Sequence, residues 1–301
     1  LSVGANGQRE EARYVRIPGG TGRVDTFGAF IETVWSPSDS FDLTSTLRYD
    51  DHSAFGGQTT GRLAFAWRPD ANTVIRGAVG TGYRAPSIDE LFGAYPEFAF
   101  VGNPNLQPEE SLSVELGADY VFANGAQISA TAFLLEIENL VQYCSAFSPP
   151  STGCPPIAST DPATLFNISG TSRRQGLELS GSLPLSDALT LTGAYTYTDA
   201  RNGAGGRLFL VPEHDIALGI DGAWANGWSG TLTAQRVMGV NETDNTPLPD
   251  YTLVNASLGY ELSEGVEAYV RVHNLFNEEY QSRRGYGTSD RAVYLGLRAR
   301  Y

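Results

Sequence analysis

The stretch SLSVELGADYVF, residues 111–122, decides how this chain folds. Apolar and polar residues alternate along it, which is the period of a β-strand whose two faces meet different surroundings. One face carries Leu112, Val114, Leu116, Ala118, Tyr120 and Phe122, and the other carries Ser113, Glu115, Gly117, Asp119 and Val121. The nature of the fold therefore depends on which solvent each face contacts.

The same alternation recurs along most of the 301 residues. No amphipathic helical pattern interrupts it, so the sequence predicts an all-β, antiparallel fold. We expect 13 strands, at about residues 26–35, 41–50, 61–68, 73–80, 111–122, 127–139, 174–183, 188–198, 214–224, 228–236, 251–262, 266–273 and 291–301.

The predicted connections alternate in length. Short connections are expected at residues 36–40, 69–72, 123–125, 186–187, 225–227 and 263–265. Long connections are expected at about 51–60, 81–110, 140–173, 199–213, 237–250 and 274–290. Short turns at one end and long loops at the other are typical of a transmembrane antiparallel meander β-barrel.

Charged residues are confined to one face of the predicted strands. Glu115 and Asp119 share a face, as do Glu267 and Arg271 on a later strand. A charge facing lipid at mid-bilayer costs about 2–4 kcal/mol, so a lipid environment would enforce this segregation. The four tryptophans all lie beside short turns, which predicts a membrane girdle of Trp35, Trp67, Trp224 and Trp228.

Composition excludes several classes of function. The formal net charge of −14 argues against nucleic-acid binding, which usually needs a basic face. No stretch approaches 18 apolar residues, so no transmembrane helix is expected. The two cysteines fit no metal or redox motif, and no cofactor is expected. A soluble β-sandwich, propeller or lectin also alternates, but does not need its tryptophans at one end.

Two motifs carry a resemblance to a known family. GTGYRAPSIDELFG (80–93) followed by GNPNLQPEES (102–111) resembles the mid-barrel signature of TonB-dependent outer-membrane receptors. VHNLFNEEYQSRRGYGTSDRAVYLGLRARY (272–301) resembles the closing segment of the same family. Within the family, the vitamin B12 (cobalamin) receptors are most similar at SRRQGLELSGSLPL (172–185), RLFLVPEHDIALGI (207–220), LPDYTLVNASLGY (248–260) and RRGYGTSDRAVYLGLR (283–298).

The resemblance implies a 22-stranded barrel, an N-terminal plug and energy supplied by the TonB complex. We therefore expect residues 1–301 to be the C-terminal part of such a barrel, about 13 of its strands, without the plug and first strands. The resemblance also implies that the protein lies in the outer membrane of a Gram-negative bacterium. The short turns and the C-terminus would then be periplasmic, and the long loops would be extracellular. Membrane lipid, lipopolysaccharide and the assembly machinery are the implied partners, with Tyr301 resembling the assembly signal.

Candidate ligand-binding residues lie in two predicted extracellular loops. They are Tyr83, Arg84, Tyr95, Phe98 and Phe100 in the first, and Arg283, Arg284 and Tyr286 in the last. The alternatives are a first loop that packs on itself and a last loop that is merely solvated. In an oxidising extracellular loop, we also expect Cys144 and Cys154 to form a disulfide, with two free thiols as the alternative.

The predicted function is active uptake of a bulky, scarce nutrient, cobalamin, through a receptor driven by TonB. A ferric-siderophore receptor of the same family is the first alternative, and a passive porin-like channel is the second. An enzyme is not expected, because no Gly-x-Ser-x-Gly motif frames any serine and the three histidines form no recognisable site.

Overall fold

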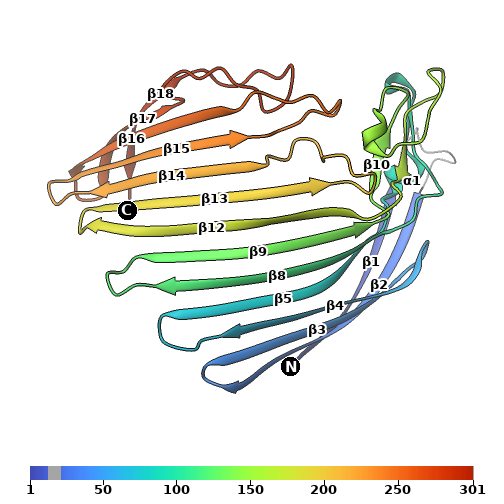
Figure 1. Cartoon of the computed structure of the whole chain (residues 1–301), viewed down its shortest axis with the longest axis horizontal. Helices are drawn as coiled ribbons and strands as arrows, with labels where there is room; N and C mark the ends of the chain where they lie inside the picture. Colours follow the sequence, from blue (N-terminus) through green and yellow to red (C-terminus); the bar gives the residue numbers. More distant parts are fainter. Residues whose placement is uncertain (13–21, 301) are drawn as a thin grey trace.

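The computed structural model describes residues 1–12 and 22–300, and its main element is one antiparallel sheet of 14 strands (Figure 1). Every strand pairs with its neighbours along the chain, without a crossover. The strands are β1 (Ser2–Ala12), β2 (Gly22–Ser38), β3 (Phe41–His52), β4 (Gly56–Trp67), β5 (Thr73–Arg84), β8 (Glu109–Val121), β9 (Gln127–Glu138), β12 (Ser172–Ser186), β13 (Leu189–Arg201), β14 (His214–Ala223), β15 (Trp228–Met238), β16 (Tyr251–Ser263), β17 (Val266–His273) and β18 (Ala292–Ala299).

The smaller elements all lie in two long connections. Two short hairpin pairings, β6 with β7 and β10 with β11, stand apart from the main sheet. These elements are α1 (Ile88–Phe92), β6 (Ala94–Tyr95), the 3-10 helix Pro96–Phe98, β7 (Phe100–Val101), β10 (Val141–Cys144), the 3-10 helix Pro150–Thr152 and β11 (Thr164–Asn167). No helix in the described ranges has the length and apolar character needed to cross a membrane.

The sheet is curved, and β1 and β18 are its two edges (Figure 1). This all-β antiparallel architecture is the one that the sequence predicts, but the expected number of strands is one too low. The added strand, β1, pairs with β2 from Ser2 opposite Glu32 to Ala12 opposite Gly22. Its sequence, SVGANGQREEA, is rich in small and polar residues, so the apolar alternation is too weak to identify it.

The expected short turns are present, while one expected long connection is not. β3 and β4 extend through most of residues 51–60, leaving only residues 53–55 between them. Gly56 follows this turn with φ +74°, a left-handed conformation that glycine adopts without strain. The other long connections are residues 85–108, 139–171, 202–213, 239–250 and 274–291.

Along the middle of the strands, the register places apolar and charged side chains on opposite faces of the sheet. At the loop end, the pairs Arg9–Asp25 and Arg173–Glu136 lie on the apolar face. On β8, Leu116 lies opposite Gly77 and Ala132, on the apolar face. On the other face, the Arg76 guanidinium pairs with Asp119 on the neighbouring strand at 3.0 Å. On the edge strand β18, Leu295 and Leu297 are 80% and 71% exposed, which is costly in water and favourable in lipid.

Glycines on the polar face let long side chains reach across a strand. Arg76 of β5 passes over Gly117 of β8 and donates to Thr131 of β9 at 2.7 Å. A Cβ atom at Gly117 would lie 2.8 Å from Arg76 Cζ and 3.0 Å from Thr131 Oγ1. The absence of a side chain at this position therefore allows three strands to be joined by one guanidinium.

Gly117→Ala should destabilise the folded protein by about 1–2 kcal/mol, because displacing the guanidinium breaks a hydrogen bond to a charged group. The matched control is Gly7→Ala on β1, where an added Cβ meets nothing within 4 Å. Denaturant unfolding of the purified protein in detergent measures the difference. Equal midpoints for the two variants would contradict the strand-bridging role of Arg76.

Candidate functional site

The five long connections gather at one end of the sheet, opposite the short turns (Figure 1). We call residues 85–108, 139–171, 202–213, 239–250 and 274–291 the loop cluster. The three largest fully buried side chains, Leu106, Cys144 and Ile168, all belong to it. The first two connections of the loop cluster, residues 85–108 and 139–171, therefore have a buried interior of their own, while the main sheet is a single layer.

A disulfide joins Cys144 at the end of β10 to Cys154, ten residues further along the chain. Cys144 is fully buried, and β10 pairs with β11 from Val141 opposite Asn167 to Cys144 opposite Thr164. Closing so short a loop stabilises a protein by about 2–3 kcal/mol in the chain-entropy description. The disulfide thus restrains residues 145–153, which project from this hairpin.

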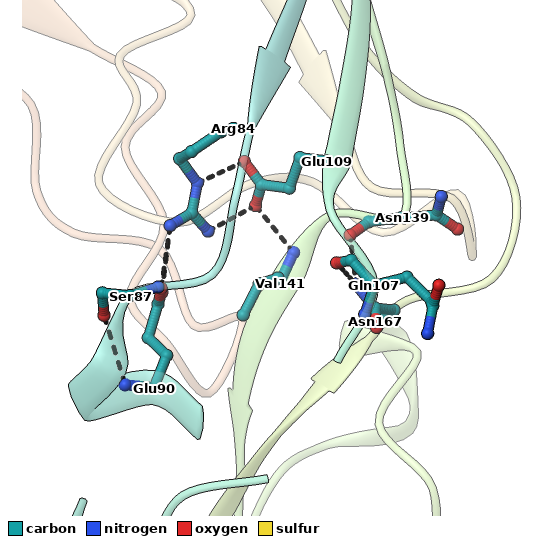
Figure 2. A network of polar contacts seen from close by, with 8 residues as sticks. All are labelled: Arg84, Ser87, Glu90, Gln107, Glu109, Asn139, Val141 and Asn167. Carbon is teal, nitrogen blue, oxygen red and sulfur yellow. Dashed lines mark hydrogen bonds and ion pairs between the residues drawn. The ribbon is translucent and has the colours of Figure 1, made fainter. Parts of the chain in front are cut away.

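Arg84, one of the candidate ligand-binding residues, anchors the start of the loop cluster (Figure 2). Its Nε and Nη2 donate to the two oxygens of Glu109 at 2.7 and 2.9 Å, and its Nη1 donates to Glu90 at 2.9 Å. Glu109 Oε1 also accepts the Val141 N–H at 2.8 Å. One guanidinium therefore ties β5, β8, α1 and the start of β10 together.

The electrostatics of this anchor favour the charged forms. Burial alone would raise the pKa of Glu90, but the Ser87 N–H and the Arg84 guanidinium outweigh it and hold that pKa below its usual value. The two carboxylates, with Glu109 the larger cause, raise the pKa of Arg84. Ser87 and Glu90 also form a capping box around the first turn of α1, which fixes the helix start.

Asn167 forms a second set of hydrogen bonds that links the two longest connections, residues 85–108 and 139–171 (Figure 2). Its side-chain N–H groups donate to the carbonyls of Gln107 at 2.9 Å and Asn139 at 2.7 Å. Its side-chain oxygen accepts the Gln107 N–H at 2.8 Å. Residues 85–108 and 139–171 are consequently one hydrogen-bonded body.

The aromatic candidates of the first loop have different environments. Tyr95 donates its hydroxyl hydrogen to Asp89, and its ring lies 6.0 Å from that of Phe100. Tyr83 has a buried hydroxyl without a hydrogen-bond partner in the described part of the chain. Only Phe98 projects strongly, with 75% of its surface exposed. The loop thus packs partly on itself and presents one aromatic ring outward.

The candidates of the last loop pack against the connection 239–250. Arg284 donates its backbone N–H to Glu242 and pairs with Asp244 at 2.8 Å. The hydroxyl and N–H of Thr246, followed by Arg284, lower the pKa of Asp244 to about 2. Arg283 lies 5.2 Å above the ring of Tyr286. This group makes no hydrogen bond to the first-loop candidates within the ranges described.

The candidates predicted from the sequence did not include several exposed aromatic residues of the loop cluster, among them Phe147, Tyr143 and Phe276. Phe147, within the disulfide-closed segment, is 88% exposed, and the Tyr143 ring stacks against Phe100 at 6.0 Å. The available signal for Phe147 was its position between the two cysteines, shortly before Pro149 and Pro150. Tyr143 could not be identified in this way, because its contact joins residues 43 positions apart.

The remaining predicted site residues lie far from the loop cluster. The side chains of Trp35, Trp67, Trp224 and Trp228 are exposed at the short-turn end of the sheet. Tyr301 lies outside the described residues. Within those residues, no group of three or more histidine, cysteine, aspartate or glutamate side chains is placed to hold a metal ion.

A curved antiparallel wall with one apolar and one polar face, and with long loops at one end, is the architecture of a transmembrane β-barrel wall. The family model described as "TonB dependent receptor-like, beta-barrel" matches residues 4–275, and the chain belongs to this family. The resemblance predicted from the sequence motifs is confirmed. Because the family consists of receptors and transporters, the prediction that the chain is not an enzyme is confirmed as well.

Curated relatives differ in what they are named for. The "Iron-regulated outer membrane virulence protein" of Vibrio cholerae is 28% identical over 99% of this chain and 48% of its own length. The "Vitamin B12 transporter BtuB" of Photobacterium profundum is 25% identical over 90% of this chain and 42% of its own length. The chain spans about half the length of the relatives it matches, which include outer-membrane proteins of Gram-negative bacteria.

Solved structures show the same fold at low sequence identity. The siderophore receptor PirA of Pseudomonas aeruginosa superposes with a TM-score of 0.77 at 22% identity, over 99% of this chain and 50% of that chain. The ferric enterobactin receptor PfeA of Pseudomonas aeruginosa, in complex with enterobactin, gives a TM-score of 0.80 at 19% identity, over 99% and 51%. At these identities the likeness establishes the fold alone.

Replacing Arg84 with glutamine should loosen the loop cluster without unfolding the sheet. Loss of the guanidinium at a half-exposed site should cost about 1–2 kcal/mol locally, which corresponds to about 5–30-fold faster hydrogen exchange at the Val141 amide. Arg68→Gln is the control, because Arg68 pairs with Asp42 at the short-turn end. Unchanged exchange at Val141 in Arg84→Gln would show that the anchor is not structural.

Proposed function

We propose that this chain is the C-terminal part of the barrel of a receptor that takes up cobalamin or a related corrinoid. The observation that carries the ligand assignment is the match to vitamin B12 transporters over 85% and 90% of the chain at 25% identity. One of the cobalamin-like sequence stretches described above, residues 283–298, includes the second half of the connection 274–291. A broad, preorganised loop cluster suits a bulky ligand better than a simple ion.

The arrangement of the sheet supports a definite orientation. We place the loop cluster outside the cell and the short turns in the periplasm, so the exposed tryptophans would lie at the periplasmic interface. The outward apolar face would contact membrane lipid and lipopolysaccharide, and Tyr301 would be presented to the assembly machinery. The plug and the remaining strands would come from the rest of the receptor, and TonB would supply the energy.

A ferric siderophore is the alternative ligand. The siderophore receptors PirA and PfeA share the fold at TM-scores of 0.77 and 0.80, which is compatible with this alternative but does not assign the ligand. The iron-regulated relative also covers more of the chain than the vitamin B12 transporters do. Both ligands would be taken up by the same TonB-driven mechanism. A growth experiment therefore distinguishes a cobalamin receptor from a siderophore receptor more directly than structural similarity does.

The complete gene should restore growth of a corrinoid-requiring Gram-negative host that lacks its own cobalamin receptor. Growth should occur at limiting cyanocobalamin and should disappear when TonB is deleted, because transport through a plugged barrel needs energy. The control is the same host carrying the empty vector at saturating cyanocobalamin. Rescue on a ferric siderophore, with none on cyanocobalamin, would show that the ligand assignment is wrong.

A further inference from the structure

The loop cluster is strongly acidic. Its five connections contain eleven acidic residues and four arginines, with no lysine or histidine, for a formal net charge of −7. Counting the two arginines of residues 13–21, which lie outside the described residues, still leaves −5. A concentration of one charge sign at an entrance attracts ligands of opposite sign and repels those of the same sign.

The arginines of the loop cluster are already engaged within the chain. An anion-binding site would need guanidinium groups left over to hold it by paired hydrogen bonds. Each of the four instead has a partner: Glu213 and the Gly239 carbonyl for Arg207, the Tyr286 ring for Arg283, Asp244 for Arg284, and the Leu275 carbonyl for Arg291. An incoming polyanion would therefore have to compete with Glu213 and Asp244 for the guanidinium groups of Arg207 and Arg284.

Several carboxylates, by contrast, are left available. Asp161, Glu279 and Asp290 are exposed, and their side chains make no hydrogen bond or ion pair with any described residue. Glu279 and Asp290 belong to the connection that also carries the cobalamin-like stretch RRGYGTSDRAVY. Unpaired carboxylates remain free to attract a positive group on an incoming ligand.

Exposed aromatic rings accompany these carboxylates. Phe98 and Phe276 are 75% and 74% exposed, and Phe276 precedes Glu279 by three residues. Asp161 is held near the Phe98 loop, because the Ala163 N–H donates to the Ala99 carbonyl at 2.7 Å. Aromatic faces carry partial negative charge, so they attract cations and also stack on flat apolar surfaces.

We propose that the loop cluster selects its ligand by charge, admitting neutral or cationic complexes with an apolar surface and disfavouring polyanionic ones. This inference rests on the proposed function, in which the cluster is the entrance for ligand. A corrinoid such as cyanocobalamin is neutral and suits this surface, as does a cationic ferric hydroxamate. A ferric tris-catecholate is polyanionic and would be repelled by both the carboxylates and the ring faces.

The test measures association of three probes with the complete protein in detergent, at low and high salt. The probes are neutral cyanocobalamin, cationic ferrioxamine B and polyanionic ferric enterobactin. The double variant Glu279→Gln, Asp290→Asn should slow ferrioxamine B association by about two- to fivefold at low salt and speed ferric enterobactin by a similar factor. The double variant Asp187→Asn, Glu264→Gln removes the same two charges at the short-turn end and should alter neither rate.

The outcomes separate this proposal from the ligand assignment. Fast association of ferric enterobactin that slows as salt rises would overturn charge selection. Binding of ferrioxamine B with the expected salt dependence, and no binding of cyanocobalamin, would overturn the corrinoid assignment and leave charge selection intact.

A second measurement reads the local potential without any ligand. A fluorophore attached at Ser282→Cys should be quenched more strongly by thallium ions than by iodide, and the double variant Glu279→Gln, Asp290→Asn should reduce that ratio. Equal quenching by the two ions in the unaltered protein would also overturn the proposal.

Discussion

The confinement of charge to one face along the middle of the strands is the constraint on which the rest of this structure depends. Arg76 pairs with Asp119, and Arg298 with Glu267, on the polar face, while the opposite face presents rows such as Leu112, Val114 and Leu116. Lipid penalises a misplaced charge by about 2–4 kcal/mol, so a strand can tolerate no slip of one residue. The register of all 14 strands follows from this penalty.

A sheet stabilised in this way does not need a central apolar core, and the largest fully buried apolar side chains of the described residues lie in the loops. Leu106, Ile168 and Cys144 lie in the loop cluster, where the disulfide and the Arg84 anchor hold the chain in place. The connections are also linked from one to the next, as Arg284 does between the last two. The loops can therefore present aromatic rings and carboxylates in fixed positions, which an unordered loop could not do.

Much of the sheet could be predicted from the sequence, because a period of two is a local signal. β1 was not identified because its residues are mostly small or polar, and the turn at residues 53–55 was hidden by the polar residues on both sides. Within the loop cluster, the sequence pattern does not reveal which side chains contact each other. Arg84 looks available in the sequence, but its partner Glu109 lies 25 residues away, and that distance carries no periodic pattern. The disulfide was predictable because only two cysteines were present.

The central claim is that one face of the sheet meets lipid and the other meets water. Single cysteines at Leu112, Ser113, Val114, Glu115 and Leu116 of β8, each carrying a spin label, test it in the complete protein reconstituted in lipid vesicles. The account predicts strict alternation, with the labels at 112, 114 and 116 relaxed by oxygen dissolved in lipid and those at 113 and 115 relaxed by a water-soluble nickel complex. Equal access of the nickel complex to all five positions would contradict it.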